Sequence, residues 1–357
     1  MAEKTATKNS SQSKLAMFKG LSKKDKQRYV ADILFNNAMY IIIVLAIIFI
    51  AIRVPTFVSL SSIVNIISLT AAKLPIALGV AGCIVLAGTD ISAGRAVGLA
   101  ACISGSLLTT ANKIFPGMGV QPLPLVILIV IAVGAVIGLV NGFCMAKFKL
   151  HPYIVTLSTQ LILYGTILLY LKMGDNNGQT LSSLSEGYRN LVAGTLFTVG
   201  GVSVPRYVLY AVILTVIMWV IWNKTTLGKN MFAVGSNEEA ANVSGVNVMR
   251  TIILVFVMAG IMYAITGFFE GARIASINGN TGFNYEADAI AACVIGGVSF
   301  VGGIGKISGI VVGVLLLQII FTGLNFLSVD QNILYIIKGL VILVACAIDM
   351  RKYLVRK

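Results

Sequence analysis

The sequence predicts an all-α integral membrane protein with about ten transmembrane helices. Of its 357 residues, 57% are hydrophobic and only 11% are charged, and its mean hydropathy is +0.93. A soluble domain carries roughly 25% charged residues, so the composition excludes that class. The apolar residues are also gathered into runs of the length that crosses a bilayer as a helix.

Basic residues cluster at the two ends of the chain, whose net charge is +14. Eight Lys or Arg residues precede Asn36, and four more lie in the last seven residues. Positive charge that flanks apolar spans is typical of cytoplasmic segments rather than of a nucleic-acid site. We therefore expect a lipid membrane as partner, no nucleic acid, and both termini in the cytoplasm.

The chain divides into a basic cytoplasmic tail at 1–35, a transmembrane domain at 36–350 and a second cytoplasmic tail at 351–357. The first tail is too long and too charged for a signal peptide, so the first apolar run is an uncleaved span. The predicted spans lie near 38–52, 63–87, 93–110, 123–145, 153–171, 207–222, 251–269, 287–301, 304–324 and 333–348.

Three segments between or within these spans carry more specific expectations. The second run contains Lys73 and Pro75, which predict a kinked or broken helix. The segment 172–206 is rich in Gly, Asn and Ser and is expected to be an exposed loop. Glycines recur every four residues from Gly134 and from Gly305, a spacing that predicts close packing between helices.

A second long polar interval inside the apolar sequence is 223–250. Its Glu-Glu-Ala-Ala core favours a helix, and Gly245 is a residue at which that helix would end. The basic residues around it place it on the cytoplasmic side. We expect a short helix outside the membrane, available to a partner.

Two glycine-rich breaks, Leu86-Ala-Gly-Thr-Asp-Ile-Ser-Ala-Gly94 and Ile295-Gly-Gly-Val-Ser-Phe-Val-Gly-Gly303, resemble each other. Duplicated halves with broken helices that line a central pathway are common among transporters. The candidate pathway residues are Gly88, Asp90, Ser92, Gly94, Arg95, Gly296, Gly297, Ser299, Gly302 and Gly303.

Ionisable residues at membrane depth are functional candidates because they are costly there. They are Lys73, Asp90, Arg95, Lys306 and Lys338. Asp90 and Arg95 lie close enough in sequence to pair with each other, so their role is either structural or functional. Lys338 is expected to reach the interface or to find a partner. A further group, Glu270, Arg273, Glu286 and Asp288, is predicted to form a charged outer rim that docks a soluble partner or only solvates a loop.

Catalytic constellations are missing from the sequence. It has a single histidine, no Cys-x-x-Cys pair and no metal-ligand spacing. Gly303-Ile-Gly-Lys306 lacks the earlier glycine and the following Ser or Thr of a phosphate loop. We therefore expect no metal, no cofactor and no ATPase activity in this chain.

Several stretches resemble the permease subunits of bacterial ABC sugar importers of the ribose/xylose/galactose type. They are Gly88-Thr-Asp-Ile-Ser-Ala-Gly-Arg-Ala-Val-Gly98, Gly138-Leu-Val-Asn-Gly142, Gly228-Lys-Asn-Met-Phe-Ala-Val-Gly-Ser-Asn237, Glu239-Ala-Ala241, Ser244-Gly-Val-Asn-Val248 and Tyr285-Glu-Ala-Asp-Ala-Ile-Ala-Ala-Cys-Val-Ile-Gly-Gly-Val-Ser299. The resemblance runs from about residue 36 to the end. It is closest to the galactose/methyl-galactoside permeases, mainly because of the Ser-Ala-Gly-Arg sequence that ends at Arg95.

The resemblance implies the ABC importer permease fold in the bacterial cytoplasmic (inner) membrane. It also implies a homodimer, a cytoplasmic ATP-binding subunit that binds ATP and magnesium, and an extracytoplasmic sugar-binding protein. By the same resemblance the polar interval is a coupling helix that contacts the ATPase. Its expected residues are Gly235, Asn237, Glu238, Glu239, Ala240, Ala241, Ser244, Gly245 and Asn247.

The function expected from residues and resemblance together is import of a monosaccharide, galactose or a methyl galactoside, by alternating access. One alternative is an ion-coupled secondary transporter, which would need an intramembrane carboxylate or histidine relay. Only Asp90 and Asp349 come near that requirement. A membrane enzyme acting on lipid-linked sugars is a further alternative, but the sequence has no carboxylate or histidine cluster at a membrane face.

Overall fold

The computed structural model describes residues 38–354. The chain divides into two compact units, with the boundary in the sequence between Ile48 and Phe49. Of the first unit only the start of helix α3 (Ala38–Arg53) is described, and all other elements belong to the second unit. The predicted tail at 1–35 lies outside the described residues. The predicted tail at 351–357 is helical through Leu354, because α15 continues that far.

The second unit is built almost entirely of helices. They are η1 (Pro55–Val58), α4 (Leu60–Val85), α5 (Ala93–Leu107), α6 (Leu123–Phe148), α7 (Pro152–Leu171), α8 (Glu186–Ala193), α9 (Tyr207–Lys224), α10 (Thr226–Ser236), α11 (Glu238–Val243), α12 (Val248–Ile274), α13 (Tyr285–Ile295), α14 (Ile307–Phe326) and α15 (Gln331–Leu354). Among the described residues, six helices are long and apolar enough to cross a membrane: α4, α6, α7, α9, α12 and α14. The prediction of a helical membrane protein is confirmed, while the count of about ten spans stays a prediction.

Helix α12 is the centre of the packing, in contact with α4, α5 and α6. Its contact with α6 depends on small residues, because a side chain at Gly138 would meet the carbonyl of Phe256 and one at Gly134 would meet that of Gly260. The close packing predicted from the glycine spacing is therefore confirmed on α6. In the second glycine set, Gly309 and Gly313 of α14 pack in the same way on α13.

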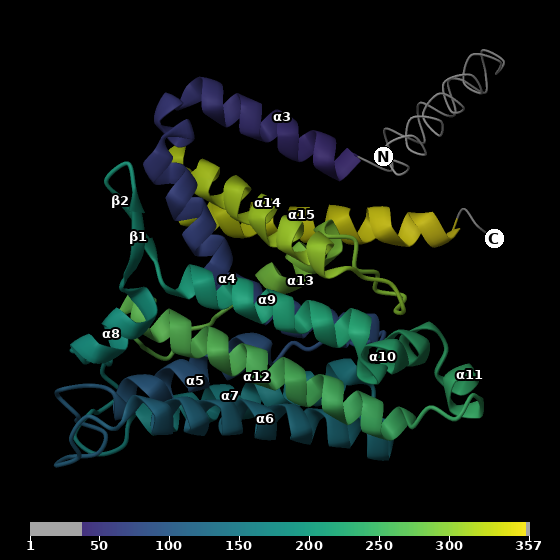
Figure 1. The fold of residues 1–357 in the computed structure, drawn as a ribbon, viewed down its shortest axis with the longest axis horizontal. Helices are drawn as coiled ribbons and strands as arrows, with labels where there is room; N and C mark the ends of the chain where they lie inside the picture. Colours follow the sequence, from purple (N-terminus) through teal and green to yellow (C-terminus); the bar gives the residue numbers. More distant parts are fainter. Residues whose placement is uncertain (1–37, 355–357) are drawn as a thin grey trace. The chain divides into compact units, whose positions relative to one another are not determined.

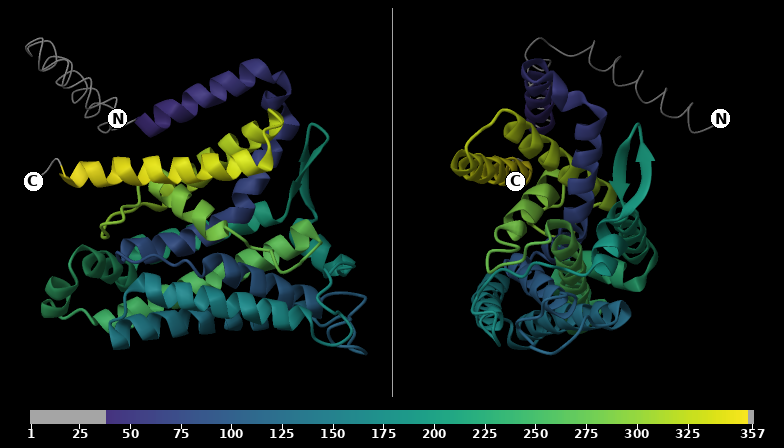
Figure 2. Two further views of the ribbon diagram at one scale, coloured as in Figure 1. Left: turned by 180° about the vertical axis from the view of Figure 1, so that it is seen from behind. Right: turned by 90° about the vertical axis from the view of Figure 1, so that its left-hand side faces the viewer.

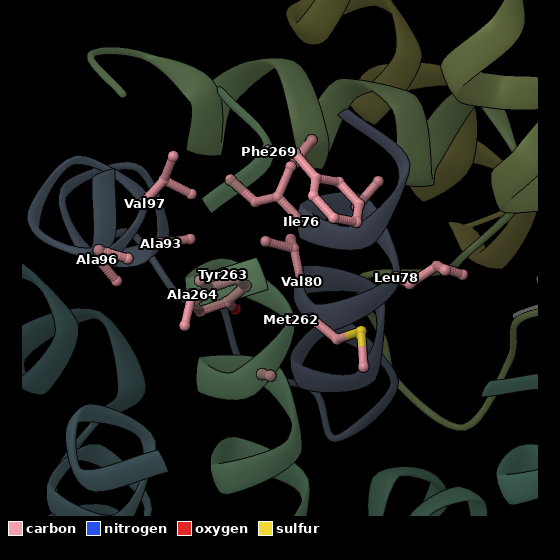
Figure 3. Close-up of a cluster of buried hydrophobic side chains, with 14 of the residues drawn as sticks. Ile76, Leu78, Val80, Ala93, Ala96, Val97, Met262, Tyr263, Ala264 and Phe269 are labelled. Carbon is pink, nitrogen blue, oxygen red and sulfur yellow. The ribbon is translucent and has the colours of Figure 1, made fainter. Parts of the chain in front are cut away.

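A buried apolar cluster joins α12 to α4 and α5. Figure 3 shows Ile76 and Val80 of α4, Val97 of α5, and Tyr263 and Phe269 of α12 in one buried cluster. All of these residues are at most 5% exposed. Burial of this extent fixes the three helices relative to one another, because core side chains pack at the density of organic crystals.

The sequence predicts a kink or a break at Pro75; the break is wrong, because α4 is one helix of 26 residues through that position, and the kink stays a prediction. Proline removes a single hydrogen bond from a helix, and neighbouring helices can support the freed carbonyl in a membrane protein. From Ala71 to Val85 almost every residue of α4 is buried. The tertiary packing on both sides of Pro75 therefore keeps the helix continuous.

The segment 172–206 is more ordered than the exposed loop that its composition predicts. It contains α8 and an antiparallel hairpin of β1 (Thr195–Val199) and β2 (Val202–Pro205). Gly200 and Gly201 form the two-residue turn, both with positive φ, which is the pattern that joins two tightly paired strands. Tyr188 anchors α8, since its buried hydroxyl donates to the Phe268 carbonyl at 2.6 Å. Burial raises the pKa of this hydroxyl well above its ordinary value, so it remains a donor.

The elements outside the long helices gather at two ends of the second unit. Figure 1 shows α8 and the hairpin at one end and α10 and α11 at the other, and the reverse view in Figure 2 agrees. We call these the hairpin end and the α10–α11 end. The candidate site residues are distributed between them.

Candidate functional site

The polar interval folds into two helices at the α10–α11 end. Thr225 accepts a hydrogen bond from the Gly228 amide and begins α10. Asn237 then interrupts the helix, and its side-chain oxygen accepts from the Ala240 amide at 2.8 Å to begin α11. The chain leaves α11 through Gly245, whose φ of +83° suits glycine. The predicted short helix is confirmed at Glu238–Val243, whereas a separate α10 was not predicted.

Helix α11 presents a mixed surface to its surroundings. Glu238, Glu239 and Ala240 are exposed, Ala241 is buried against the protein, and Val243 is 89% exposed. Among the described residues α11 has one ion pair, and it is long, with Glu238 Oε1 at 3.9 Å from Lys149 Nζ and both side chains largely exposed. An apolar tip and two carboxylates on a short capped helix form a surface suited to a protein partner.

The end of α10 near Gly235 packs on both glycine-rich breaks. A side chain at Gly235 would collide with the carbonyl of Val85, the last residue of α4. That carbonyl accepts a hydrogen bond from the Gly303 amide at 2.8 Å, and Gly302 lies against the Gly235 carbonyl. Three segments that are distant in sequence therefore meet backbone to backbone, with no intervening side chain to absorb a displacement.

The two breaks begin with the same helix ending. At the end of α4 the Gly88 amide donates to Cys83 O, and at the end of α13 the Val298 amide donates to Cys293 O. In each case the preceding residue, Ala87 or Gly297, has a positive φ and donates to the carbonyl three residues before it. This is the Schellman pattern, in which a left-handed residue ends a helix. The resemblance predicted from sequence therefore extends to the hydrogen bonds.

After this shared start, the break after α4 is held by side chains. The Asp90 carboxylate is buried and accepts from the amide and the hydroxyl of Ser92, at 2.9 and 2.6 Å. Asn141 of α6 donates to the Ser92 hydroxyl at 3.0 Å, and Thr159 of α7 donates to Asn141 Oδ1 at 2.6 Å. Neither residue was a candidate site residue from sequence, although Asn141 lies in the Gly138–Gly142 stretch that carries the family resemblance. The signal for Thr159 was only a polar residue in an apolar run.

The break after α13 is held mainly by backbone contacts. Ser299 accepts from the Val301 amide through its hydroxyl, and its own amide donates to the Ile304 carbonyl. Gly296 lies against the Gly309 carbonyl of α14. Lys306, a candidate intramembrane charge, is exposed at the start of α14.

The expected pairing of Asp90 with Arg95 is wrong. The Arg95 guanidinium donates to the Gly279 carbonyl at 3.0 Å. It also lies over the rings of Tyr164 and Phe283, 4.2 and 5.2 Å from their centroids. Local hydrogen bonds from Ser92 satisfy the carboxylate, and the long arginine side chain reaches aromatic faces that attract a cation.

The expected charged rim is buried for the most part. Asp288 contacts Lys73 at 2.8 Å and Lys338 at 2.9 Å, so Lys338 has the partner that the sequence suggested. Glu270 is 0% exposed and pairs with Arg273 at 2.6 Å. These carboxylates join α4, α12, α13 and α15 within the protein, where an unpaired charge would be very costly.

The rest of the predicted rim divides between the interior and the surface. Glu286 is 7% exposed, and its carboxylate lies against Gly94 of α5. The Arg273 side chain is 27% exposed and borders a polar hollow of about 570 Å³ at the hairpin end. Glu186 and Arg189 of α8 line the same hollow. The docking role of the rim stays a prediction, and α8 offers charges that sequence reasoning did not include.

Two further features complete the candidate residues. Trp222 is buried beside α10 with its ring edge-to-face to Phe232, and among the described side chains its indole N–H has no acceptor. The backbone of Asp349 is helical, but its side chain lies outside those described. No group of three or more His, Cys, Asp or Glu residues in the described part of the chain is placed to hold a metal ion.

Comparison with known proteins identifies the family. Residues 62–346 match the family described as branched-chain amino acid transport system / permease component. The galactose/methyl galactoside import permease protein MglC of Haemophilus influenzae is 45% identical over 329 residues, which cover 91% of this chain and 97% of that protein. MglC of Escherichia coli K12 is 43% identical over 340 residues, 94% and 99% of the two chains.

A ribose relative is more distant. The ribose import permease protein RbsC of Haemophilus influenzae is 31% identical over 326 residues, 90% of this chain and 94% of that protein. No solved structure matches the chain. The resemblance to sugar-import permeases is thus confirmed over nearly the whole length. The chain belongs to the family of branched-chain amino acid transport system permease components.

Proposed function

We propose that this chain is the membrane permease subunit of an ATP-binding-cassette importer of galactose or methyl galactoside. The observation that carries the proposal is the 43–45% identity to two galactose/methyl galactoside permeases over almost their full length. The ribose permease, at 31%, is a weaker match over a similar length. Galactoside is therefore favoured over ribose as the sugar.

The proposed arrangement places the chain in the inner membrane with both termini and the α10–α11 end in the cytoplasm. The basic residues near this end, among them Lys147, Lys149, Lys224 and Arg250, support the orientation. In this topology the four helices α3, α5, α13 and α15 complete the ten spans. Helices α4 and α13 occupy equivalent places in the two duplicated halves, which the matching helix endings support.

The ATP-binding subunit, which carries ATP and magnesium, docks on α11 in this proposal. The support is geometric, because Val243 and Glu239 are exposed on one side while Gly235 packs on both breaks from the other. A rigid helix in that position passes a movement of the ATPase to the ends of α4 and α13. This permease subunit itself carries no hydrolytic step.

The sugar crosses beside the two breaks and, by the same proposal, between two copies of the chain. An extracytoplasmic sugar-binding protein delivers it to the hairpin end, where Glu186, Arg189 and Arg273 border the polar hollow. The buried Arg95 and the half-buried Lys73, Arg273 and Lys338 accompany four buried carboxylates (Asp90, Glu270, Glu286 and Asp288). The cations thus offset the buried negative charge, which suits a neutral sugar.

One observation favours an ion-coupled transporter as the second candidate. Asp90 is buried and, within the described residues, has no ion-pair partner, as a proton-carrying carboxylate would require. Both hydrogen bonds from Ser92 nevertheless go to Oδ1 of this carboxylate, which gives it a structural role. We therefore retain the ATP-driven importer as the proposed function.

The two candidates are separated by uptake of labelled galactose into proteoliposomes that contain the permease, the ATP-binding subunit and the sugar-binding protein. The proposal expects uptake to require ATP and to survive a proton or sodium ionophore. Uptake that continues without the ATP-binding subunit and collapses with the ion gradient contradicts it. Competition by unlabelled ribose and xylose in the same assay measures the preference of the importer among the three sugars.

A further inference from the structure

The connection between α12 and α13 enters the bundle without helical structure. Residues 275–284 begin near the hairpin end, where Ile277 pairs with Leu181 in a short β-bridge. They reach Gly282, which lies against the carbonyl of Gly94 near the start of α5. Ile277 lies against Gly105 of α5, eleven positions after Gly94, so the segment descends about 16 Å along that helix at 1.5 Å per residue.

Non-helical backbone at membrane depth is tolerated only where protein covers it or where it borders water. Part of this segment is covered, since Thr281 is 8% exposed and packs on Gly98. Four of its residues are exposed: Ser276, Asn278, Asn280 and Phe283, the last of them 49% exposed. Within the described residues the Asn280 side-chain amide has no hydrogen-bond partner, which would be costly against hydrocarbon.

The exposed side chains adjoin Arg95 of α5. The Arg95 guanidinium is 4.2 Å from the Tyr164 ring centroid and 5.2 Å from that of Phe283. Arg95 also donates to the carbonyl of Gly279, between the two asparagines. Arg95 is itself only 7% exposed, so it holds the exposed amides of Asn278 and Asn280 and the ring of Phe283 on one surface from behind.

We propose that Asn278, Asn280 and Phe283, supported by the buried Arg95 and the half-buried Tyr164, form a sugar-contacting wall of the translocation pathway. A hexose presents hydroxyls at its edge, which amide groups bind, and a C–H face, which packs on an aromatic ring. Few polar groups are present and the sugar can leave as readily as it enters, as a pathway requires. The inference rests on the proposed function only for the identity of the sugar.

Water access to the wall is testable independently of transport. Cys144 and Cys346, the two half-buried native cysteines, are first replaced by serine. Asn280→Cys and Phe283→Cys are then treated with a small hydrophilic methanethiosulfonate in membranes that hold the complete complex. The controls are Leu161→Cys and Val212→Cys, at apolar positions of α7 and α9 that are 65% and 55% exposed.

The wall predicts labelling of the two test cysteines about tenfold faster than of the controls, because only a hydrated thiol ionises to the reactive thiolate. Galactose supplied during ATP-driven turnover slows that labelling. Equal rates at all four positions overturn the proposal, whether lipid or a second copy covers this surface. Labelling that galactose leaves unchanged overturns the assignment to the sugar.

Uptake supplies the second readout. Asn280→Leu and Phe283→Ala are expected to lower galactose uptake about fivefold to tenfold, as loss of one hydrogen bond or ring contact implies. Phe143→Ala, at a 41% exposed position of α6, should leave it unchanged. Full uptake by both wall variants contradicts the wall while the proposed function stands. Absence of uptake by the unmodified protein contradicts the proposed function instead, and the labelling rates still decide whether the surface is hydrated.

Discussion

The α-carbon of Gly235 in α10 lies directly against the main-chain carbonyl of Val85, the last residue of α4. The same carbonyl accepts the amide of Gly303, in the break that follows α13. A helix at one end of the molecule is therefore in rigid contact with the ends of two interior helices. This contact is the physical basis for assigning α10 and α11 to energy coupling.

The exposed tip of α11 should be necessary for binding the ATP-binding subunit and unnecessary for folding. Val243→Arg places a charge on a side chain that is 89% exposed and touches little of its own chain. Its effect on the free energy of unfolding should stay within about 0.5 kcal/mol. Co-purification with the ATP-binding subunit should fall by at least about tenfold, since a charge replaces an apolar contact at a protein interface.

Glu239→Arg, which reverses an exposed charge on the same helix, should act in the same direction. The control is Val199→Arg, which places the same charge on an apolar residue of the hairpin that is 42% exposed and lies outside the membrane spans. That variant should retain the ATP-binding subunit. Retention by Val243→Arg and Glu239→Arg as well would remove the assignment of α11.

Removal of Asp288 should destabilise the protein far more than removal of either lysine. Asp288→Asn leaves Lys73 and Lys338 without a carboxylate in the interior, at a cost of about 3–5 kcal/mol. Lys338→Met leaves the Lys73 pair at 2.8 Å intact and should cost much less. Reversible denaturation of the purified protein in detergent measures the difference.

The triple variant Lys73→Met, Asp288→Asn and Lys338→Met provides the control. It removes all three charges, so much of the stability lost in Asp288→Asn should return. Equal destabilisation by Lys338→Met and Asp288→Asn, or no recovery in the triple variant, would show that charge balance does not explain the stability of this contact.

Asn141 should hold the break after α4 to helices α6 and α7. Asn141→Leu removes its hydrogen bonds with Ser92 and Thr159, and bonds of this kind within membranes contribute about 0.6 to 1.7 kcal/mol each. The free energy of unfolding should fall by about 1–2 kcal/mol. Asn223→Leu, which breaks only a contact with Trp219 in its own exposed turn, is the matched control and should change little. The hypothesis fails if the two variants are equally stable.

The sequence was sufficient to predict the helical class and the position of most long helices, because apolar run length is a direct consequence of bilayer thickness. It was also sufficient for α11, where Asn237 caps the first turn and Gly245 ends the helix through local chemistry. These features depend on residues near one another in the chain. Local composition is enough to read them.

Features set by distant residues were harder to predict. Arg95 has an acidic neighbour in sequence at Asp90, but its partners lie on α7 and in the segment before α13. The carboxylates expected at an outer rim are buried because α4 and α15 supply lysines to Asp288. Pro75 was overread as a break because the packing around α4 is invisible in its own sequence. The hairpin had a local signal, Gly200-Gly201 between residues that favour strands, that could have identified it.

The contact of Gly235 with Val85 is tested most directly by measuring sugar uptake and ATP hydrolysis in the same proteoliposomes. Gly235→Ala adds a methyl group that collides with the Val85 carbonyl, whereas Gly165→Ala on α7 meets nothing within 4 Å and is the control. We predict that Gly235→Ala retains the ATP-binding subunit and hydrolyses ATP but imports galactose at least about tenfold more slowly, a change of about 1.4 kcal/mol in the coupled step. Gly165→Ala should match the unmodified protein in both rates. Import by Gly235→Ala at the unmodified rate, with the same amount of ATP consumed per sugar, would contradict the account.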